Sequence, residues 1–238
     1  MSKRISGHRG DVPYLPREDI KAEAALVLTE FGQAHGQATL PPIPVDDIVE
    51  LHLQLALEFK DMHQLFSLAD VHGALWMNEA LVGVDQSLDP KVFPAKLGRF
   101  RFTLAHEAGH WRLHKKYYRK DPAQGALFGE PGKPTYICRS SEARKPVEWQ
   151  ADFVAANLLM PRRMMVSASE GWRGDPKPMA LPDICGPAVA KANGCGDDEV
   201  MEAFAEPLAT KFQVSAPAMR IRLEELGLLL RQRASTLF

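Results

Sequence analysis

The segment HEAGH, residues 106–110, carries two histidines and a glutamate with the spacing of a metal-dependent hydrolytic centre. On a helix, residues four apart lie on one face, so His106 and His110 could direct their imidazoles at one shared ion. Glu107 would then lie close enough to act on a water molecule held by that ion. The alternative interpretation is that both histidines are core residues with ordinary hydrogen-bond partners.

A catalytic zinc ion needs three protein ligands and an open position for water, so a third ligand must come from elsewhere. His114 follows His106 by eight residues, about 12 Å along a helix, which is too far to bind the same ion. We expect it to be a partly buried residue at the wall of a cleft. Glu148 and Asp152 lie four apart in the next strongly helical segment. We expect Glu148 to be the third ligand and Asp152 to hydrogen bond a ligating histidine.

The alternative for these two acids is a solvated pair on a surface helix. Two helices, one with H-E-x-x-H and one with E-x-x-x-D, form the arrangement of gluzincin metallopeptidases. Zinc would polarise a water molecule and a substrate carbonyl, and Glu107 would transfer the proton. An extended peptide could add to the edge of a sheet formed by residues 72–85. Candidate oxyanion donors, among which the sequence does not choose, are Tyr117, Tyr118, Tyr136 and Arg162.

The elements that must position these residues follow from apolar periodicity, prolines and glycines. The polarity of the residues alternates along segment 53–59, which indicates a strand, with an amphipathic helix as the alternative. Segment 72–85 indicates two strands joined by a turn at Asn78 and Glu79. We expect a long surface loop over 119–146 and an irregular stretch over 171–196. Ser215 is the expected cap of the last helix. Helices are expected over 17–31, from Asp46 or Asp47 to 51, and over 102–116, 146–160, 199–212 and 215–233.

The composition is that of an ordinary globular protein, with 45% hydrophobic and 25% charged residues among 238. A net charge of −1 gives no overall attraction to nucleic acid or to an anionic membrane. The three cysteines, Cys138, Cys185 and Cys195, are most simply free thiols and fit a reducing compartment. We find neither the apolar run of a signal peptide nor a membrane span, and we expect a cytoplasmic protein.

The segments RFTLAHEAGHWRLH (101–114) and EWQADFVAANLLMP (148–161) closely resemble the two signature helices of the ImmA/IrrE metallo-endopeptidases. The similarity extends over roughly residues 17–230. It implies a zincin-like domain in which His106, His110 and Glu148 occupy the positions of the metal ligands. It also implies that Glu107 occupies the position of the catalytic acid/base.

The predicted fold is therefore α+β. A zincin-like peptidase domain, with a small three-stranded sheet packed on the H-E-x-x-H helix, precedes a C-terminal helical module that resembles a helix-turn-helix. The expected limits are an N-terminal arm over 1–16, the peptidase domain over 17–170, an irregular connection over 171–196 and the C-terminal module over 197–238.

Family members of known role cleave a helix-turn-helix repressor and thereby release stress or mobile-element genes. The resemblance thus implies a zinc-dependent endopeptidase with a protein substrate of that class, and Mn²⁺ or Fe²⁺ are alternatives to Zn²⁺. Many relatives carry an N-terminal DNA-binding module, which we do not find here. Direct nucleic-acid binding is not expected, because Glu224 and Glu225 balance Arg220 and Arg222. The alternatives are a non-catalytic metal-binding regulator acting through its C-terminal helices and a toxin-like or general peptidase.

Overall fold

The computed structural model describes residues 12–36, 39–117, 134–139, 145–184 and 196–233. The chain divides into two units, one of residues 1–39 and 44–158, the other of residues 40–43 and 159–238. This division follows contacts within the chain, and the domain limits expected from the sequence stay predictions. No described helix combines the length and the apolar character that crossing a bilayer requires.

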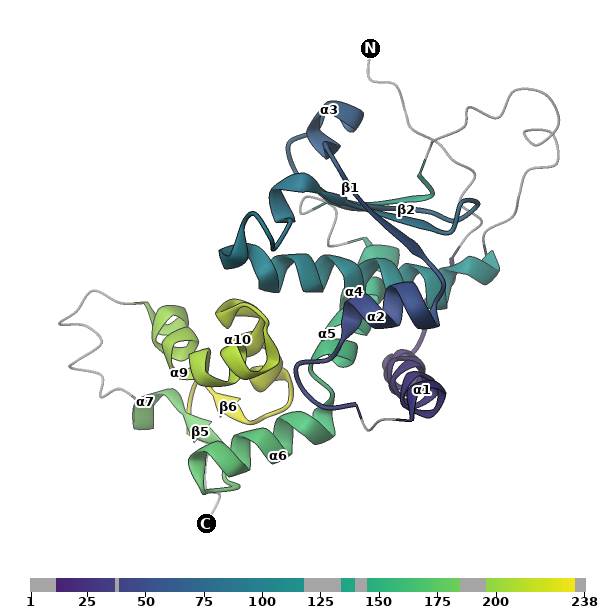
Figure 1. Cartoon of the computed structure of the whole chain (residues 1–238). Coiled ribbons are helices and arrows are strands. Elements are labelled where there is room, and N and C mark those ends of the chain that lie inside the picture. The colour runs from purple at the N-terminus through teal and green to yellow at the C-terminus, as the bar shows by residue number, and fades with distance from the viewer. Residues whose placement is uncertain (1–11, 37–38, 118–133, 140–144, 185–195, 234–238) are drawn as a thin grey trace, which may run out of the picture. The chain divides into compact units, whose positions relative to one another are not determined.

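A four-stranded sheet covers one side of the first unit (Figure 1). The strands are β1 (Ala56–Lys60), β2 (Val71–Trp76), β3 (Leu81–Asp85) and β4 (Tyr136–Arg139), in the order β1-β3-β2-β4. Strand β1 runs parallel to β3, while β2 runs antiparallel to both β3 and β4. The predicted strand near residue 56 and the predicted turn after β2 are confirmed.

The predicted three-stranded sheet is wrong by one strand, because β4 lies inside the predicted surface loop. Its segment YICR is short and is flanked by Gly, Pro and charged residues, so composition over the whole stretch hides it. The aromatic and β-branched residues at 136 and 137 are nevertheless typical of a strand. Pairing with β2 supplies the backbone hydrogen bonds that so short a segment cannot supply for itself.

The helices of the first unit surround the segment that carries the H-E-x-x-H motif. Helix α1 extends four residues beyond its prediction and ends where Gly36 adopts φ 64°, a left-handed conformation that favours glycine. The motif helix α4 begins at Leu97, before the predicted start at residue 102. The elements are α1 (Arg17–His35), α2 (Val45–Asp47), the π-helical η1 (Ile48–His52), α3 (Met62–Phe66), η2 (Gln86–Leu88), η3 (Pro94–Lys96), α4 (Leu97–His114), η4 (Lys115–Tyr117) and α5 (Pro146–Leu159).

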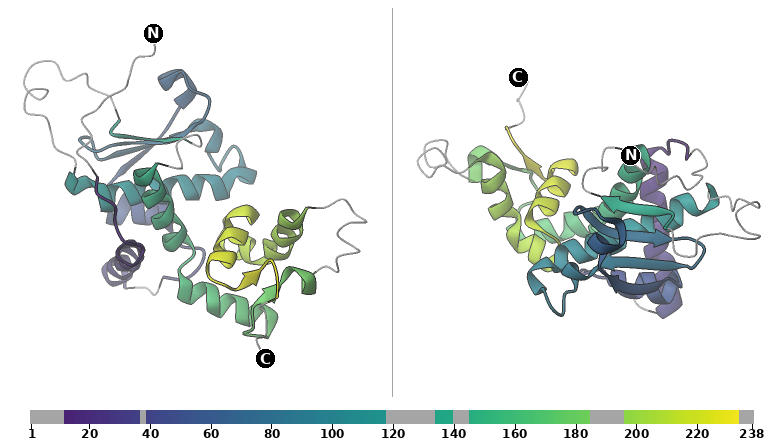
Figure 2. Two further views of the ribbon diagram at one scale, coloured as in Figure 1. Left: turned by 180° about the vertical axis from the view of Figure 1, so that it is seen from behind. Right: turned by 90° about the horizontal axis from the view of Figure 1, so that it is seen from above.

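Helix α4 is the central element of this unit and is buried along most of its length. The strands β2, β3 and β4 pack against it, and Figure 2 shows the sheet lying over it from two further sides. Helix α1 contacts it too, and Arg112 of α4 donates a hydrogen bond of 2.6 Å to Glu23 of α1. Burial on several sides explains why this helix is apolar almost all round.

The second unit is built from α6 (Arg162–Arg173), β5 (Met179–Ala180), α7 (Leu181–Ile184), α9 (Asp197–Phe212), α10 (Ala216–Glu225) and β6 (Leu229–Leu230). Helices α9 and α10 pack against each other. Ser215 caps α10, as predicted, by accepting a hydrogen bond from the Ala218 amide. Helix α10 ends at Glu225 rather than at 233, because Gly227 takes φ 69° and β6 then pairs with β5. Within α10, Arg220 pairs with Glu224 and Arg222 with Glu225.

Candidate metal centre

Helices α4 and α5 bring together three donor atoms from residues that are far apart in the sequence. The Nε2 atoms of His106 and His110 lie 3.0 Å apart. The Oε2 atom of Glu148 lies 3.3 Å from each of them. All three residues are buried, and together they form a group that could hold a metal ion. The structure thus brings together the three residues expected to be ligands.

In both His106 and His110 the Nδ1 atom makes a hydrogen bond, which leaves Nε2 available to bind an ion. His106 donates from Nδ1 to Oδ1 of Asp152, at 2.8 Å. Nδ1 of His110 lies 2.9 Å from Nδ1 of His114. Nε2 of His114 in turn lies 3.2 Å from Oε1 of Gln150, whose Nε2 donates to the carbonyl of Pro13.

This chain of hydrogen bonds determines which nitrogen carries each proton. The Pro13 carbonyl only accepts, so the Gln150 amide nitrogen faces it and the Gln150 oxygen faces His114. His114 must then donate from Nε2 and accept at Nδ1, so His110 donates from Nδ1. The Nε2 lone pairs of both motif histidines consequently point to one place, as metal ligation requires.

His114 is therefore not the partly buried residue of a cleft wall that its position in the sequence predicts. Its exposed fraction is 0%, and its hydrogen bond with Nδ1 of His110 orients that ring. The sequence pattern misses this role because it depends on Gln150, which lies 36 residues away in another helix.

The donor set fits a divalent metal ion in both chemistry and spacing. Two ligands bonded to a tetrahedral ion at about 2.0–2.1 Å lie about 3.3 Å from each other. The observed separations of 3.0, 3.3 and 3.3 Å are close to that value. The other carboxylate oxygen of Glu148 is buried and has no hydrogen-bond partner among the described residues. An ion at this place would compensate a buried carboxylate that is otherwise costly.

Glu107 lies beside this group and is completely buried. Neither of its carboxylate oxygens has a hydrogen-bond partner among the residues that the structure describes. Burial raises the pKa of Glu107 to about 8. Gly73 of the neighbouring strand lets this side chain and Thr103 approach closely, since a Cβ at residue 73 would lie 2.5 Å from Cγ2 of Thr103 and 3.0 Å from Oε1 of Glu107.

The charges of two of the three donor residues suit ligation. Burial by itself would lower the pKa of the third, His106, but Cys138 and the hydrogen bond with Asp152 outweigh burial and raise that pKa well above its usual value, so His106 must release a proton when an ion binds. Burial lowers the pKa of His110 to about 3, so this imidazole is neutral at ordinary pH. Burial by itself would raise the pKa of Glu148, but its hydrogen bonds with His106 and His110 outweigh burial and leave that pKa well below its usual range. The site therefore presents a carboxylate and a neutral imidazole, which are the protonation states that bind metal ions.

Gly109 is the point at which α5 crosses α4. A Cβ at this position would lie 3.1 Å from the Cα and carbonyl oxygen of Ala151 and from the Cβ of Val154. The two helices therefore approach each other more closely than a side chain at residue 109 would allow. This contact explains a glycine inside a helix, where it costs about 1 kcal/mol.

Strand β4 adds two residues to the site. The ring of Tyr136 stacks on His110 with centroids 4.1 Å apart and planes inclined by 17°. Cys138, two residues further and on the same face of the strand, lies against His106 and Glu107. Tyr136 is one of the four oxyanion candidates, whereas the sequence predicts Cys138 only as a free thiol. The aromatic and β-branched segment around Ile137 is the signal that could have placed both residues on a strand.

A cavity of about 210 Å³ opens beside the candidate ligands. Two of those ligands, His106 and Glu148, line it together with Asp152 and Cys138, which gives a small molecule or a peptide group access to the donor atoms. The other lining residues are His72, Arg99, Phe102, Thr103 and Arg139.

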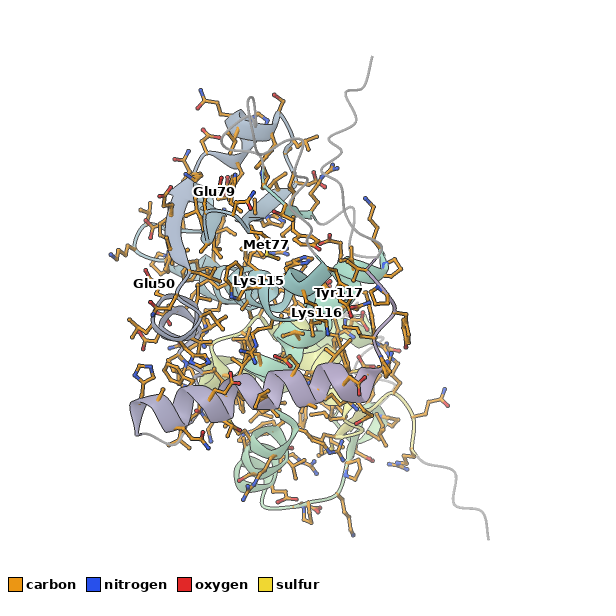
Figure 3. The ribbon with its side chains drawn as sticks, turned by 90° about the vertical axis from the view of Figure 1, so that its right-hand side faces the viewer. Glu50, Met77, Glu79, Lys115, Lys116 and Tyr117 are labelled. Carbon is orange, nitrogen blue, oxygen red and sulfur yellow. The ribbon has the colours of Figure 1, made fainter. Side chains whose placement is uncertain are left out.

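Of the remaining oxyanion candidates, the structure describes Tyr117 and Arg162. Tyr117 is at the end of η4, three residues beyond His114, next to Lys115 and Lys116 (Figure 3). It does not line the cavity. Arg162 begins α6 in the second unit. Tyr118, Cys185 and Cys195 lie outside the described residues.

Comparison with known protein families identifies a match for this chain. The sequence profile of the IrrE N-terminal-like domain, a peptidase family designated M78, matches residues 95–224, more than half of the chain. The matched stretch includes α4 and α5 with all three candidate ligands and Glu107. No curated protein matches the chain.

Proposed function

This chain belongs to the IrrE N-terminal-like family of metallopeptidases, and from that premise we propose that it is a zinc-dependent endopeptidase. The observation that carries the proposal is the convergence of His106 Nε2, His110 Nε2 and Glu148 Oε2 within 3.0–3.3 Å, with the carboxylate of Glu107 adjacent. Two imidazoles and one carboxylate with a free corner are the ligand set of catalytic zinc. Mn²⁺ and Fe²⁺ accept the same donors, so the identity of the ion as zinc is itself part of the proposal.

In the proposed mechanism, His106, His110 and Glu148 would hold the ion, and Asp152 and His114 would orient the two histidines. Bound there, the ion supplies Lewis-acid polarisation of a water molecule and of the scissile carbonyl. Glu107 takes the proton of the attacking water and gives it to the leaving amine. Its carboxylate suits this role because it is buried, is close to His106 and is not engaged in another hydrogen bond within the described part of the chain.

The substrate that we propose is an extended segment of a protein. The predicted docking edge, on the hairpin of β2 and β3, is covered on both sides, because β1 pairs with β3 and β4 pairs with β2. The outer edge of β4 is the better place for strand addition, since Cys138 and Arg139 of this strand line the cavity beside the donor atoms. A helix-turn-helix repressor is the substrate class that we propose, by analogy with family members of known role.

The test is to incubate the purified chain with the helix-turn-helix protein encoded nearest to its gene, with and without a chelator. We expect cleavage that the chelator stops and added zinc restores. Glu107→Gln should retain bound zinc but lose cleavage, by about 100-fold or more for a general base. The matched control is Glu79→Gln, which changes an exposed glutamate in the turn after β2 (Figure 3) and should cleave normally.

Cleavage that persists in Glu107→Gln, or in wild type stripped of metal, would contradict the mechanism. Zinc binding without cleavage of this substrate or of an unfolded protein would instead favour the non-catalytic regulator. That regulator would act through the C-terminal helices α9 and α10, so its partner binding should survive Glu107→Gln.

A further inference from the structure

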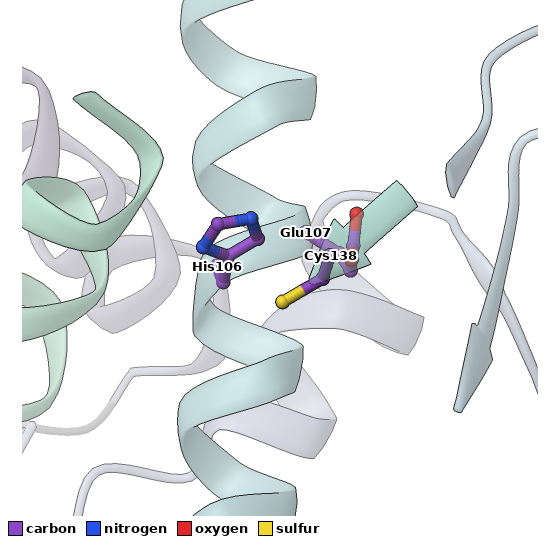
Figure 4. A group of neighbouring side chains, drawn as sticks. All are labelled: His106, Glu107 and Cys138. Carbon is purple, nitrogen blue, oxygen red and sulfur yellow. The ribbon is translucent and has the colours of Figure 1, made fainter. Parts of the chain in front are cut away.

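The thiol of Cys138 is a metal-binding group that the proposed hydrolysis does not use. Its Sγ, a ring nitrogen of His106 and a carboxylate oxygen of Glu107 all lie within 4.8 Å of one another. Figure 4 shows the three side chains gathered between α4 and β4. Since His106 belongs both to this group and to the group of candidate ligands, the thiol adjoins the place where the ion would bind.

The strand holds Cys138 in this position by several independent contacts. Tyr136 is buried and stacks on His110, which fixes β4 against α4 two residues before the cysteine. In the sheet, Cys138 pairs with Gly73, the glycine whose missing side chain leaves room for Glu107. The thiol therefore faces a buried carboxylate that has no hydrogen-bond partner within the described residues.

We propose that Cys138 is a fourth, autoinhibitory ligand, whose sulfur takes the coordination position that the attacking water needs. This inference rests on the proposed metal site. Thiolate sulfur binds zinc at about 2.3 Å, so on a tetrahedral ion it would lie about 3.6 Å from a ligating nitrogen. Sγ lies within 4.8 Å of a ring nitrogen of His106, so it reaches this separation from His106 by a shift of roughly 1 Å, which a change in the side-chain torsion of the cysteine can supply.

The step is an exchange of ligands in which nothing is oxidised or reduced. The thiol proton passes to solvent, and the sulfur replaces one water molecule, which also leaves to solvent. Hydrolysis is then blocked because the sulfur occupies the position of the attacking water. When the thiol withdraws it takes up a proton from solvent, and a water molecule returns to the open corner.

The inference is tested on the full chain loaded with Co²⁺, which reports a sulfur ligand by a thiolate-to-metal charge-transfer absorption. We expect this absorption in wild type and its loss in both Cys138→Ser and Cys138→Ala, with one Co²⁺ still bound per chain. The matched control is the double variant Cys185→Ser with Cys195→Ser, which keeps Cys138 and should keep the absorption. Bound metal should also slow alkylation of Cys138 by iodoacetamide about tenfold, since the free thiolate is the nucleophile.

An identical cobalt spectrum in wild type and Cys138→Ala, or an alkylation rate that metal does not change, would overturn the inference. Faster cleavage of the repressor substrate by Cys138→Ser than by wild type would support the inhibitory role, and equal rates would overturn it. If no variant cleaves any substrate while the absorption depends on Cys138, the hydrolytic proposal fails and ligation by the thiol stands.

Discussion

Replacement of Glu107 by glutamine should make the metal-free protein more stable while it abolishes peptidase activity. The ordinary pKa of a glutamate is 4.5, and burial raises the pKa of Glu107 to about 8 in the folded chain. Between these two values, the folded chain holds a proton that the unfolded chain has lost. Below pH 4.5 Glu107 is protonated in both states, and the full stability of wild type is present. As the pH rises from 4.5 toward 8, the unfolded chain releases the proton while the folded chain keeps it, so wild type loses stability over this range.

The magnitude follows from the separation of the two pKa values. Keeping this proton in the folded chain lowers the free energy of unfolding of wild type by about 3 kcal/mol at pH 7 and by roughly 1 kcal/mol at pH 5. Glutamine has nearly the same shape and does not titrate, so it avoids this cost at every pH. In either protein the two buried polar atoms at the end of this side chain lack partners among the described residues, and that penalty largely cancels in the comparison. The stability of Glu107→Gln relative to wild type should rise by about 2–3 kcal/mol from pH 5 to pH 7.

The assay is urea unfolding of the chelator-treated proteins at pH 5, 6 and 7. The comparison between variants removes the pH dependence of His106, His110 and His114, which both proteins share. Glu79→Gln, at an exposed position, should show no such trend. A difference between Glu107→Gln and wild type that is the same at all three pH values would refute the reasoning, because it would mean that the carboxyl group is not perturbed by burial.

Three further predictions concern the elements that hold the ion. Asp152→Ala removes the acceptor of the His106 Nδ1 proton and should weaken zinc binding about 10–100-fold in a competition titration with a chelator. Glu148→Ala should weaken binding further than Asp152→Ala, and equal zinc affinity to wild type would exclude Glu148 as a ligand. Gly109→Ala gains about 1 kcal/mol of helix propensity but forces a Cβ to 3.1 Å from the Ala151 backbone, and overpacking costs about 1–3 kcal/mol. Thermal melts should therefore show a net loss of stability, together with weaker zinc binding, and a stabilised variant with unchanged affinity would contradict the close approach of α4 and α5.

Spacing along the chain is enough to predict the parts of the site that depend on one helix at a time. His106 and His110 share a face because they are four residues apart, and the same spacing joins Glu148 to Asp152. The cap at Ser215 and the exclusion of His114 as a ligand are equally local, since each needs only the dimensions of a helix. These interpretations agree with the structure because helical geometry is the same in every protein.

Packing between distant segments determines which other groups reach the candidate metal centre. Strand β4 exists because β2 offers it an edge, and without that pairing nothing indicates that Tyr136 lies on His110 or Cys138 beside His106. His114 becomes an orienting residue through Gln150 and Pro13. The packing of α4 under the sheet leaves Glu107 without a hydrogen-bond partner in the part of the chain that the structure describes. Each of these relations joins segments between about 25 and 140 residues apart, whose proximity depends on the packing of the whole unit rather than on the preference of any short segment.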